Sequence, residues 1–100
     1  MDEAEKAATR RLQDQNLAAA LARPADLLVL DEACAAWQLD MVDRQLLERA
    51  VRGRPAGQEV VLTGRTPAPW MEELADYSTE MRCHRHPYEK GVAARKGVEF

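Results

Sequence analysis

Apolar side chains recur at helical spacing in two segments of this chain, and a third segment is helical by its composition, with a looser apolar stripe. Residues 3–22 are rich in good helix formers and are followed closely by Pro24, which predicts a helix there. The stretch 43–52 carries its Leu, Ala and Val residues on one helical face, with Asp43 as a predicted N-cap. A third helix is expected to begin at Pro69, because proline suits the first position of a helix.

Three shorter segments have the pattern of β-strands. Residues 26–31 contain four consecutive large aliphatic side chains between two acids, as in a strand buried on both faces of a parallel sheet. A second strand is predicted over Val60–Leu62 and a third over Tyr77–Arg82, with an irregular tail from Cys83. Strands that alternate with helices in this order predict the α/β class, a parallel sheet and right-handed crossovers.

Composition and charge narrow the classes of protein that remain. Length predicts a single domain over residues 1–100, although 17 of its apolar residues are Ala and the core is expected to be thin. A net charge of −3 argues against duplex nucleic acid as a partner. No apolar run is long enough to span a membrane, no secretory signal is visible, and the two cysteines are expected to be free thiols. A cytoplasmic location is therefore expected.

Candidate chemistry lies where the first two predicted strands end. Asp31 and Glu32 leave the first strand at the edge where α/β sheets place ligands, a pattern typical of carboxylates that hold Mg²⁺ against phosphates. The alternative is a strand that simply meets a helix N-cap. Thr63, Gly64 and Arg65 end the second strand at the same edge, where the guanidinium could bind phosphate or form a structural salt bridge with the acids.

Other candidate groups favour structural interpretations. Cys83, His84 and His86 are of the types that bind zinc, but only Cys34 is left to complete a set of four ligands. A solvated turn is the preferred interpretation, and neither cysteine stands in a nucleophile motif. The aromatic residues Trp37, Trp70 and Tyr88 are expected to be core or interface anchors. The 100 residues contain no G-x-x-x-x-G-K-[ST] phosphate loop.

Four segments together resemble the carboxyl-terminal half of the P-loop corrinoid adenosyltransferases. They are LLVLDE, RPAGQEVVLTGR, ELADYSTEMR and HPYEKGVAARKGVEF, in this order from about Asp26 to Phe100. The resemblance implies a partial RecA-like P-loop NTPase fold, a parallel sheet with flanking helices that is usually dimeric. It also implies a reaction in which the cobalt of a reduced corrinoid attacks the 5′-carbon of ATP and releases triphosphate.

The resemblance carries roles over to individual residues. Asp31 and Glu32 match the acids near Mg²⁺, and Arg65 matches an arginine near the triphosphate of ATP. The family's terminal segment is matched, without individual roles, by His86, Gly91, Lys96 and Gly97. Corrinoid-binding and catalytic residues are not assigned.

The family's phosphate loop and its strand are absent from these residues. In the family this strand lies between those that match Val60–Leu62 and Tyr77–Arg82. Without that strand, either the remaining strands pair with each other, a partner fills the gap in the sheet, or this chain is a truncated member of the family. Two functions follow: a transferase that requires a homo-oligomer or a separate P-loop-bearing chain, and a non-catalytic dimerising or regulatory remnant that binds corrinoid or a partner.

Overall fold

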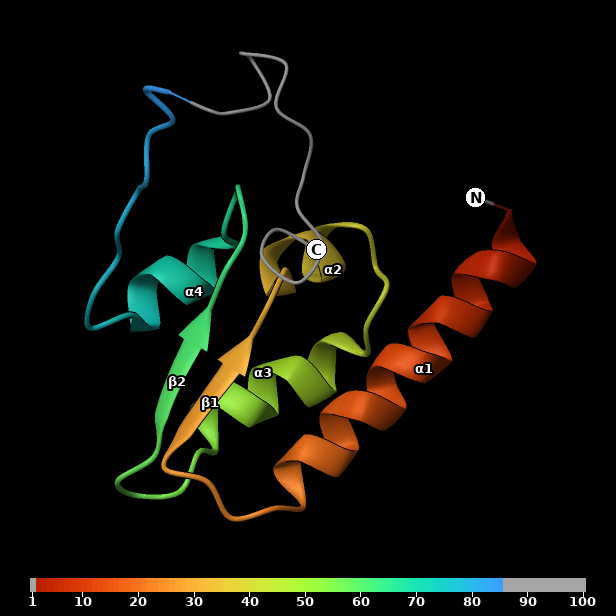
Figure 1. Ribbon diagram of the computed structural model, residues 1–100. Helices are drawn as coiled ribbons and strands as arrows, with labels where there is room; N and C mark the ends of the chain where they lie inside the picture. The colour runs from red at the N-terminus through yellow and green to blue at the C-terminus, as the bar shows by residue number, and fades with distance from the viewer. Residues whose placement is uncertain (1, 86–100) are drawn as a thin grey trace.

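The computed structural model describes residues 2–85 (Figure 1). His86, Tyr88, Gly91, Lys96 and Gly97, which the sequence analysis singled out, lie outside the described residues. In chain order the elements are α1 (Glu3–Leu21), β1 (Leu27–Leu30), α2 (Ala33–Gln38), α3 (Arg44–Arg52), β2 (Glu59–Leu62) and α4 (Pro69–Leu74).

The three predicted helices are confirmed, and the predicted start signals at Asp43 and Pro69 are present. The Asp2 carboxylate accepts a hydrogen bond from the Glu5 N–H at 2.7 Å and so caps α1. The Asp43 carboxylate accepts from the N–H groups of Gln45 and Leu46 at 3.0 and 3.2 Å at the start of α3. Pro69 is the first residue of α4, where its missing N–H costs no helical hydrogen bond.

Strands β1 and β2 lie side by side and run in the same direction, which confirms the predicted parallel pairing (Figure 1). The register places Leu28 opposite Val60 and Leu30 opposite Leu62. The Thr63 N–H donates to the Leu30 carbonyl at 3.2 Å and extends the pairing beyond the last paired residues. The chain segments that follow the two strands therefore leave the sheet at the same edge.

One hydrophobic core lies between the sheet and the helices. It joins side chains from all four helices, among them Leu17, Cys34, Leu47 and Met71. Leu30 and Leu62 pack against it from the strands. All four helices therefore contribute to the core on one side of the sheet, and the described residues form two layers.

Trp37 and Trp70 anchor the short helices to this core, as predicted. Their rings meet edge to face with centroids 5.2 Å apart. The guanidinium groups of Arg44 and Arg52 lie over Trp37 and Trp70, at 5.3 and 5.7 Å from the ring centroids. Arg44 also donates two hydrogen bonds to the Trp37 carbonyl at 3.0 and 2.7 Å. These contacts hold α2, α3 and α4 together.

The structure differs from the expected elements in three respects. Residues 77–82 form no strand, and the side chains of Tyr77 and Met81 are 93% and 92% exposed. A strand there would need a hydrogen-bonding neighbour, and within residues 2–85 the sheet consists of β1 and β2 alone. Helix α2 was not predicted, because six residues are too few to display a helical period.

The third correction concerns the faces of the sheet. Residues 26–31 were expected to be buried on both faces, whereas Leu28 is 8% exposed and its neighbours Leu27 and Val29 are 54% and 52% exposed. The helices that the structure describes cover one face only.

None of the helices in residues 2–85 combines the length and apolar character that crossing a bilayer requires.

Candidate functional site

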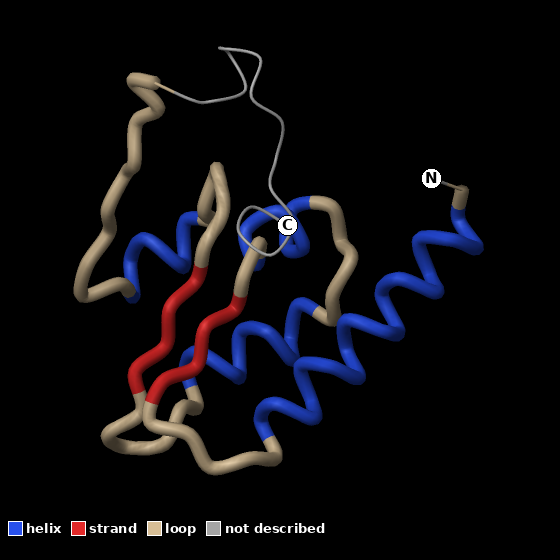
Figure 2. The backbone as a smooth tube through the Cα atoms, viewed as in Figure 1, coloured by secondary structure: helices blue, strands red, loops and turns tan. Residues whose placement is uncertain are grey.

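The candidate site is the edge of the sheet where β1 and β2 end. Figure 2 shows that both strands lead into loops at the same end of the sheet, one running to α2 and the other to α4. The first loop carries Asp31 and Glu32, and the second carries Thr63, Gly64 and Arg65. Parallel pairing thus brings together the two segments that were predicted to meet at one edge of the sheet.

Thr63 ties the two loops together with its hydroxyl group. The hydroxyl donates to Asp31 Oδ1 at 2.7 Å and accepts from the Glu32 N–H at 2.9 Å. The Thr63 carbonyl accepts from the Cys34 N–H at 3.3 Å. One carboxylate oxygen of Asp31 is thereby fixed by a hydrogen bond to a charged acceptor, a strong type of contact.

Thr63 was expected only as the end of the second strand, without this role. The signal that could have found it is the register: when Leu30 pairs with Leu62, the next residues, Asp31 and Thr63, fall opposite each other. A hydroxyl beside a carboxylate at a strand end makes a hydrogen bond readily.

Glu32 has a left-handed backbone conformation, with φ +57° and ψ +25°. Residues other than glycine adopt this region uncommonly, and such positions concentrate at functional sites. Glu32 stands at the N-cap of α2 without a side-chain capping hydrogen bond. The predicted alternative was a strand that simply meets a helix N-cap. Glu32 does occupy the N-cap position of α2, but its carboxylate is exposed and does not cap the helix.

Gly64 allows the second loop to approach α2 closely. Its φ is +154°, and a Cβ added there would meet the Cβ of Cys34 at 2.4 Å and its Sγ at 2.9 Å. Cys34 is buried, with its Sγ 3.9 Å from Met71 Sδ. Burial raises the pKa of the Cys34 thiol, and the negative charges of Glu32 and Glu72 act in the same direction. Cys34 is thus a packing residue beneath the loops and is held in its protonated form.

Arg65 is exposed and follows Gly64 at the same edge. Among residues 2–85 no ion pair joins Arg65 to Asp31 or Glu32, so the structural salt bridge is not formed. Of the side chains predicted for the site, Asp31 is held by a hydrogen bond, and Glu32 and Arg65 are both solvent-accessible.

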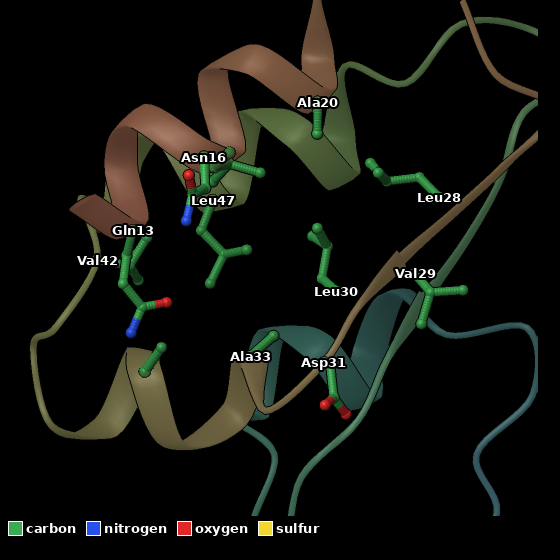
Figure 3. A pocket seen from close by; sticks show the side chains of 12 residues that line it. Gln13, Asn16, Ala20, Leu28, Val29, Leu30, Asp31, Ala33, Val42 and Leu47 are labelled. Carbon is green, nitrogen blue, oxygen red and sulfur yellow. The ribbon is translucent and has the colours of Figure 1, made fainter. Parts of the chain in front are cut away.

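A pocket of about 240 Å³ lies beside this edge, between α1 on one side and β1, α2 and α3 on the other (Figure 3). Its walls include Leu28, Leu30 and Leu47, and Gln13 and Asn16 of α1 line it as well. Asp31 lies on the opposite side from Gln13 and Asn16 (Figure 3).

Helix α1 is held beyond the pocket by polar contacts. The Asp14 carboxylate accepts from the Asp43 N–H at 2.6 Å, and Arg10 pairs with Asp40 at 3.3 Å.

Carboxylate oxygens are the groups at this edge that could hold a metal. Asp31 and Glu32 are adjacent and exposed, and Mg²⁺ in phosphate sites is commonly bound by one or two carboxylates together with the phosphates and water. The donor set therefore fits Mg²⁺. Residues 2–85 hold no group of three or more His, Cys, Asp and Glu side chains arranged around a common point. Cys34 and Cys83 are both free thiols, the first buried and the second exposed.

Comparison with known proteins confirms the family that the sequence resembles. The family model of ATP:corrinoid adenosyltransferase BtuR/CobO/CobP matches residues 1–100. A corrinoid adenosyltransferase of Pseudomonas aeruginosa is 42% identical over 74 residues, which are 74% of this chain and 36% of that protein. One from Sinorhizobium is 37% identical over 75 residues, 74% of this chain and 35% of that protein. One from Escherichia coli is 31% identical over 93 residues, 93% of this chain and 43% of that protein.

The structure is an α/β arrangement in which acidic residues follow one of two parallel strands at the edge where both strands end. The family model matches all 100 residues of the chain. The chain belongs to the ATP:corrinoid adenosyltransferase family. The stretches that match cover less than half the length of these relatives, 36% of the Pseudomonas protein and 43% of the Escherichia coli protein.

Proposed function

We propose that this chain contributes the acidic edge of a Mg²⁺–triphosphate site to an ATP:corrinoid adenosyltransferase with a RecA-like fold. The observation that carries the proposal is the hydrogen bond of 2.7 Å from the Thr63 hydroxyl to Asp31, which fixes a carboxylate at the edge where Glu32 and Arg65 also lie. The family match supports the type of reaction, transfer of an adenosyl group from ATP to a corrinoid.

The roles of the residues follow from their chemistry. Asp31 and Glu32 would hold Mg²⁺, which when bound neutralises charge on the triphosphate. Arg65, exposed and free of ion pairs with these acids, would bind the triphosphate oxygens directly. Triphosphate is the group that leaves when the reduced cobalt attacks the 5′-carbon of ATP. These residues would therefore stabilise the leaving group, a contribution that depends on their preorganisation.

The phosphate loop that this site requires would come from outside these 100 residues, which contain no such motif. We expect the 100-residue chain to bind Mg-ATP too weakly for calorimetry to detect. Micromolar affinity, about −8 kcal/mol, would show that no further loop is required.

The decisive measurement is adenosyl transfer to a reduced corrinoid by this chain mixed with a P-loop-bearing segment of a relative. Glu32→Gln and Arg65→Ala should each lower the rate about 10²–10³-fold, the usual loss for one preorganised electrostatic contact. Glu73→Gln and Arg23→Ala are matched controls, since both side chains are exposed and lie on other segments of the chain. Unchanged rates in both site variants would contradict the assignment and favour the non-catalytic remnant.

A further inference from the structure

Helix α2 lies between two residues with a strained backbone conformation. Within residues 2–85, the residues other than glycine that have a positive φ are Glu32 and Asp40, at +57° and +54°. Glu32 is the N-cap of α2, and Asp40 is the second residue after its end. A left-handed conformation of this kind persists only where surrounding contacts hold it. The contacts at both ends of α2 therefore decide whether Glu32 keeps its conformation.

The contacts that hold Glu32 all involve its backbone. Its N–H donates to the Thr63 hydroxyl at 2.9 Å, and its carbonyl accepts from the Ala36 N–H at 3.1 Å in the first turn of α2. The Glu32 carboxylate caps no N–H of the helix and joins none of the ion pairs within residues 2–85. The orientation of this carboxylate thus depends on the first turn of α2 being formed.

Arg44 holds the other end of α2. Its Nε and Nη2 donate to the Trp37 carbonyl at 3.0 and 2.7 Å, and Nη2 also lies 3.5 Å from the Gln38 carbonyl oxygen. Its guanidinium lies over the Trp37 ring, and its Nε is 3.8 Å from the Asp40 carboxylate. A cation at the last carbonyls of a helix satisfies them and interacts favourably with the helix dipole. Arg44 therefore caps the C-terminal end of α2.

A helix of six residues depends on such contacts. Isolated helices shorter than about 12 residues are marginal in water, because the first turn is costly to form. Helix α2 has six residues and is about 9 Å long at the usual rise per residue. A helix this short behaves as one unit, so loosening its last turn also loosens its first.

We propose that Arg44 is a positioning residue for Glu32 and acts through α2. By fastening the last turn of the helix, Arg44 keeps the first turn formed and holds Glu32 in its left-handed conformation at the edge of the sheet. The proposal rests on the proposed function only for the role of the Glu32 carboxylate. Arg44 itself is at the opposite end of α2 and has no contact with the acids of the site.

Arg52 provides a matched control on the neighbouring helix turn. Its guanidinium lies 5.7 Å from the centroid of the Trp70 ring and pairs with Glu48 at 3.6 Å. Its side chain is 50% exposed, against 46% for Arg44. Neither contact of Arg52 involves a carbonyl of α2. Arg52→Ala therefore removes the same kind of aromatic contact and leaves the cap of α2 in place.

The first test is hydrogen exchange of backbone amides in the 100-residue chain. Arg44→Ala should speed exchange at the Glu32 and Ala36 amides about tenfold or more, because local opening of α2 releases both hydrogen bonds. Arg52→Ala should leave these two amides unchanged. Arg44→Lys keeps a charged donor near the carbonyls, so exchange should return toward the native rate. The lysine variant also provides the measurement if the alanine variant does not fold.

The second test is adenosyl transfer by the chain mixed with the P-loop-bearing segment of a relative. Arg44→Ala should lower the rate about 10–100-fold, the usual loss when a group that orients a metal ligand is removed. Arg52→Ala should not lower it. Because Arg44 acts through Glu32, Arg44→Ala combined with Glu32→Gln should be no slower than Glu32→Gln alone.

The two tests separate this proposal from the proposed function. Equal effects of Arg44→Ala and Arg52→Ala on the Glu32 amide overturn the positioning role, and so do rate losses that multiply in the double variant. Faster exchange at Glu32 in Arg44→Ala, together with an unchanged rate in Glu32→Gln, supports the hold of Arg44 on Glu32 and counts against the proposed function alone.

Discussion

Gly64 occupies a position where a hydrogen atom fits and a methyl group does not. A Cβ there would lie 2.4 Å from the Cβ of Cys34, at a φ of +154° that side chains rarely adopt. We expect Gly64→Ala to lower the free energy of unfolding by about 2–4 kcal/mol, from backbone strain and overpacking together. Urea unfolding followed by the fluorescence of Trp37 and Trp70 measures the loss.

Gly57 provides the matched control for this substitution. Its φ is also positive, +88°, but an added Cβ would have no heavy atom within 4 Å beyond those of Gly57 and its two chain neighbours. Gly57→Ala should therefore cost about 1 kcal/mol, from backbone strain alone. If both substitutions cost the same, the close approach between Gly64 and Cys34 is not a determinant of stability.

Thr63 is the residue on which the geometry of the acidic edge depends. Thr63→Val keeps the shape of the side chain and removes both hydrogen bonds, to Asp31 and from the Glu32 N–H. We expect a loss of about 1–2 kcal/mol in the free energy of unfolding, and faster hydrogen exchange at the Glu32 amide. Thr63→Ser retains the hydroxyl and should restore both readouts. Equal behaviour of the valine and serine variants would speak against this role.

Among the elements, α3 shows most directly how a side chain determines where a helix begins. The Asp43 carboxylate accepts hydrogen bonds from two N–H groups in its first turn, at 3.0 and 3.2 Å. Asp43→Ala should lower the melting temperature, with a loss of about 1 kcal/mol in the free energy of unfolding. Asp43→Asn keeps an acceptor oxygen and should recover most of that loss. A full loss in the asparagine variant would indicate that charge matters here more than capping.

The elements that could be predicted are those whose signals are local. Asp43 and Pro69 mark helix starts through capping and backbone geometry, which neighbouring residues alone decide. The segment Tyr77–Arg82 has residues suited to a strand but forms none, because a strand exists only when another strand pairs with it. Helix α2 escaped prediction for a related reason: contacts such as Trp37 with Trp70 stabilise it, and its own sequence shows no helical period.

At the scale of the whole molecule, the sequence predicted which site segments would meet but not how they are joined. Alternating elements were enough to place Asp31 and Arg65 at one edge, since parallel strands end together. The hydroxyl of Thr63 between the loops depends on the register, and the uncovered state of Val29 depends on which segments are present to cover it. Neither property is encoded in the period of a single segment.

The two-stranded sheet also affects how readily the chain aggregates. Within residues 2–85, each strand pairs on one side only, so its other edge presents N–H and C=O groups that can template a foreign strand. The exposed side chains of Leu27, Val29 and Val61 lie on the same strands, and their apolar surface further favours aggregation. Glu59 is the one charge on these two strands and acts as a gatekeeper against stacking. Aggregation of the 100-residue chain should therefore rise with concentration, and any segment that covers these strands would protect them from it.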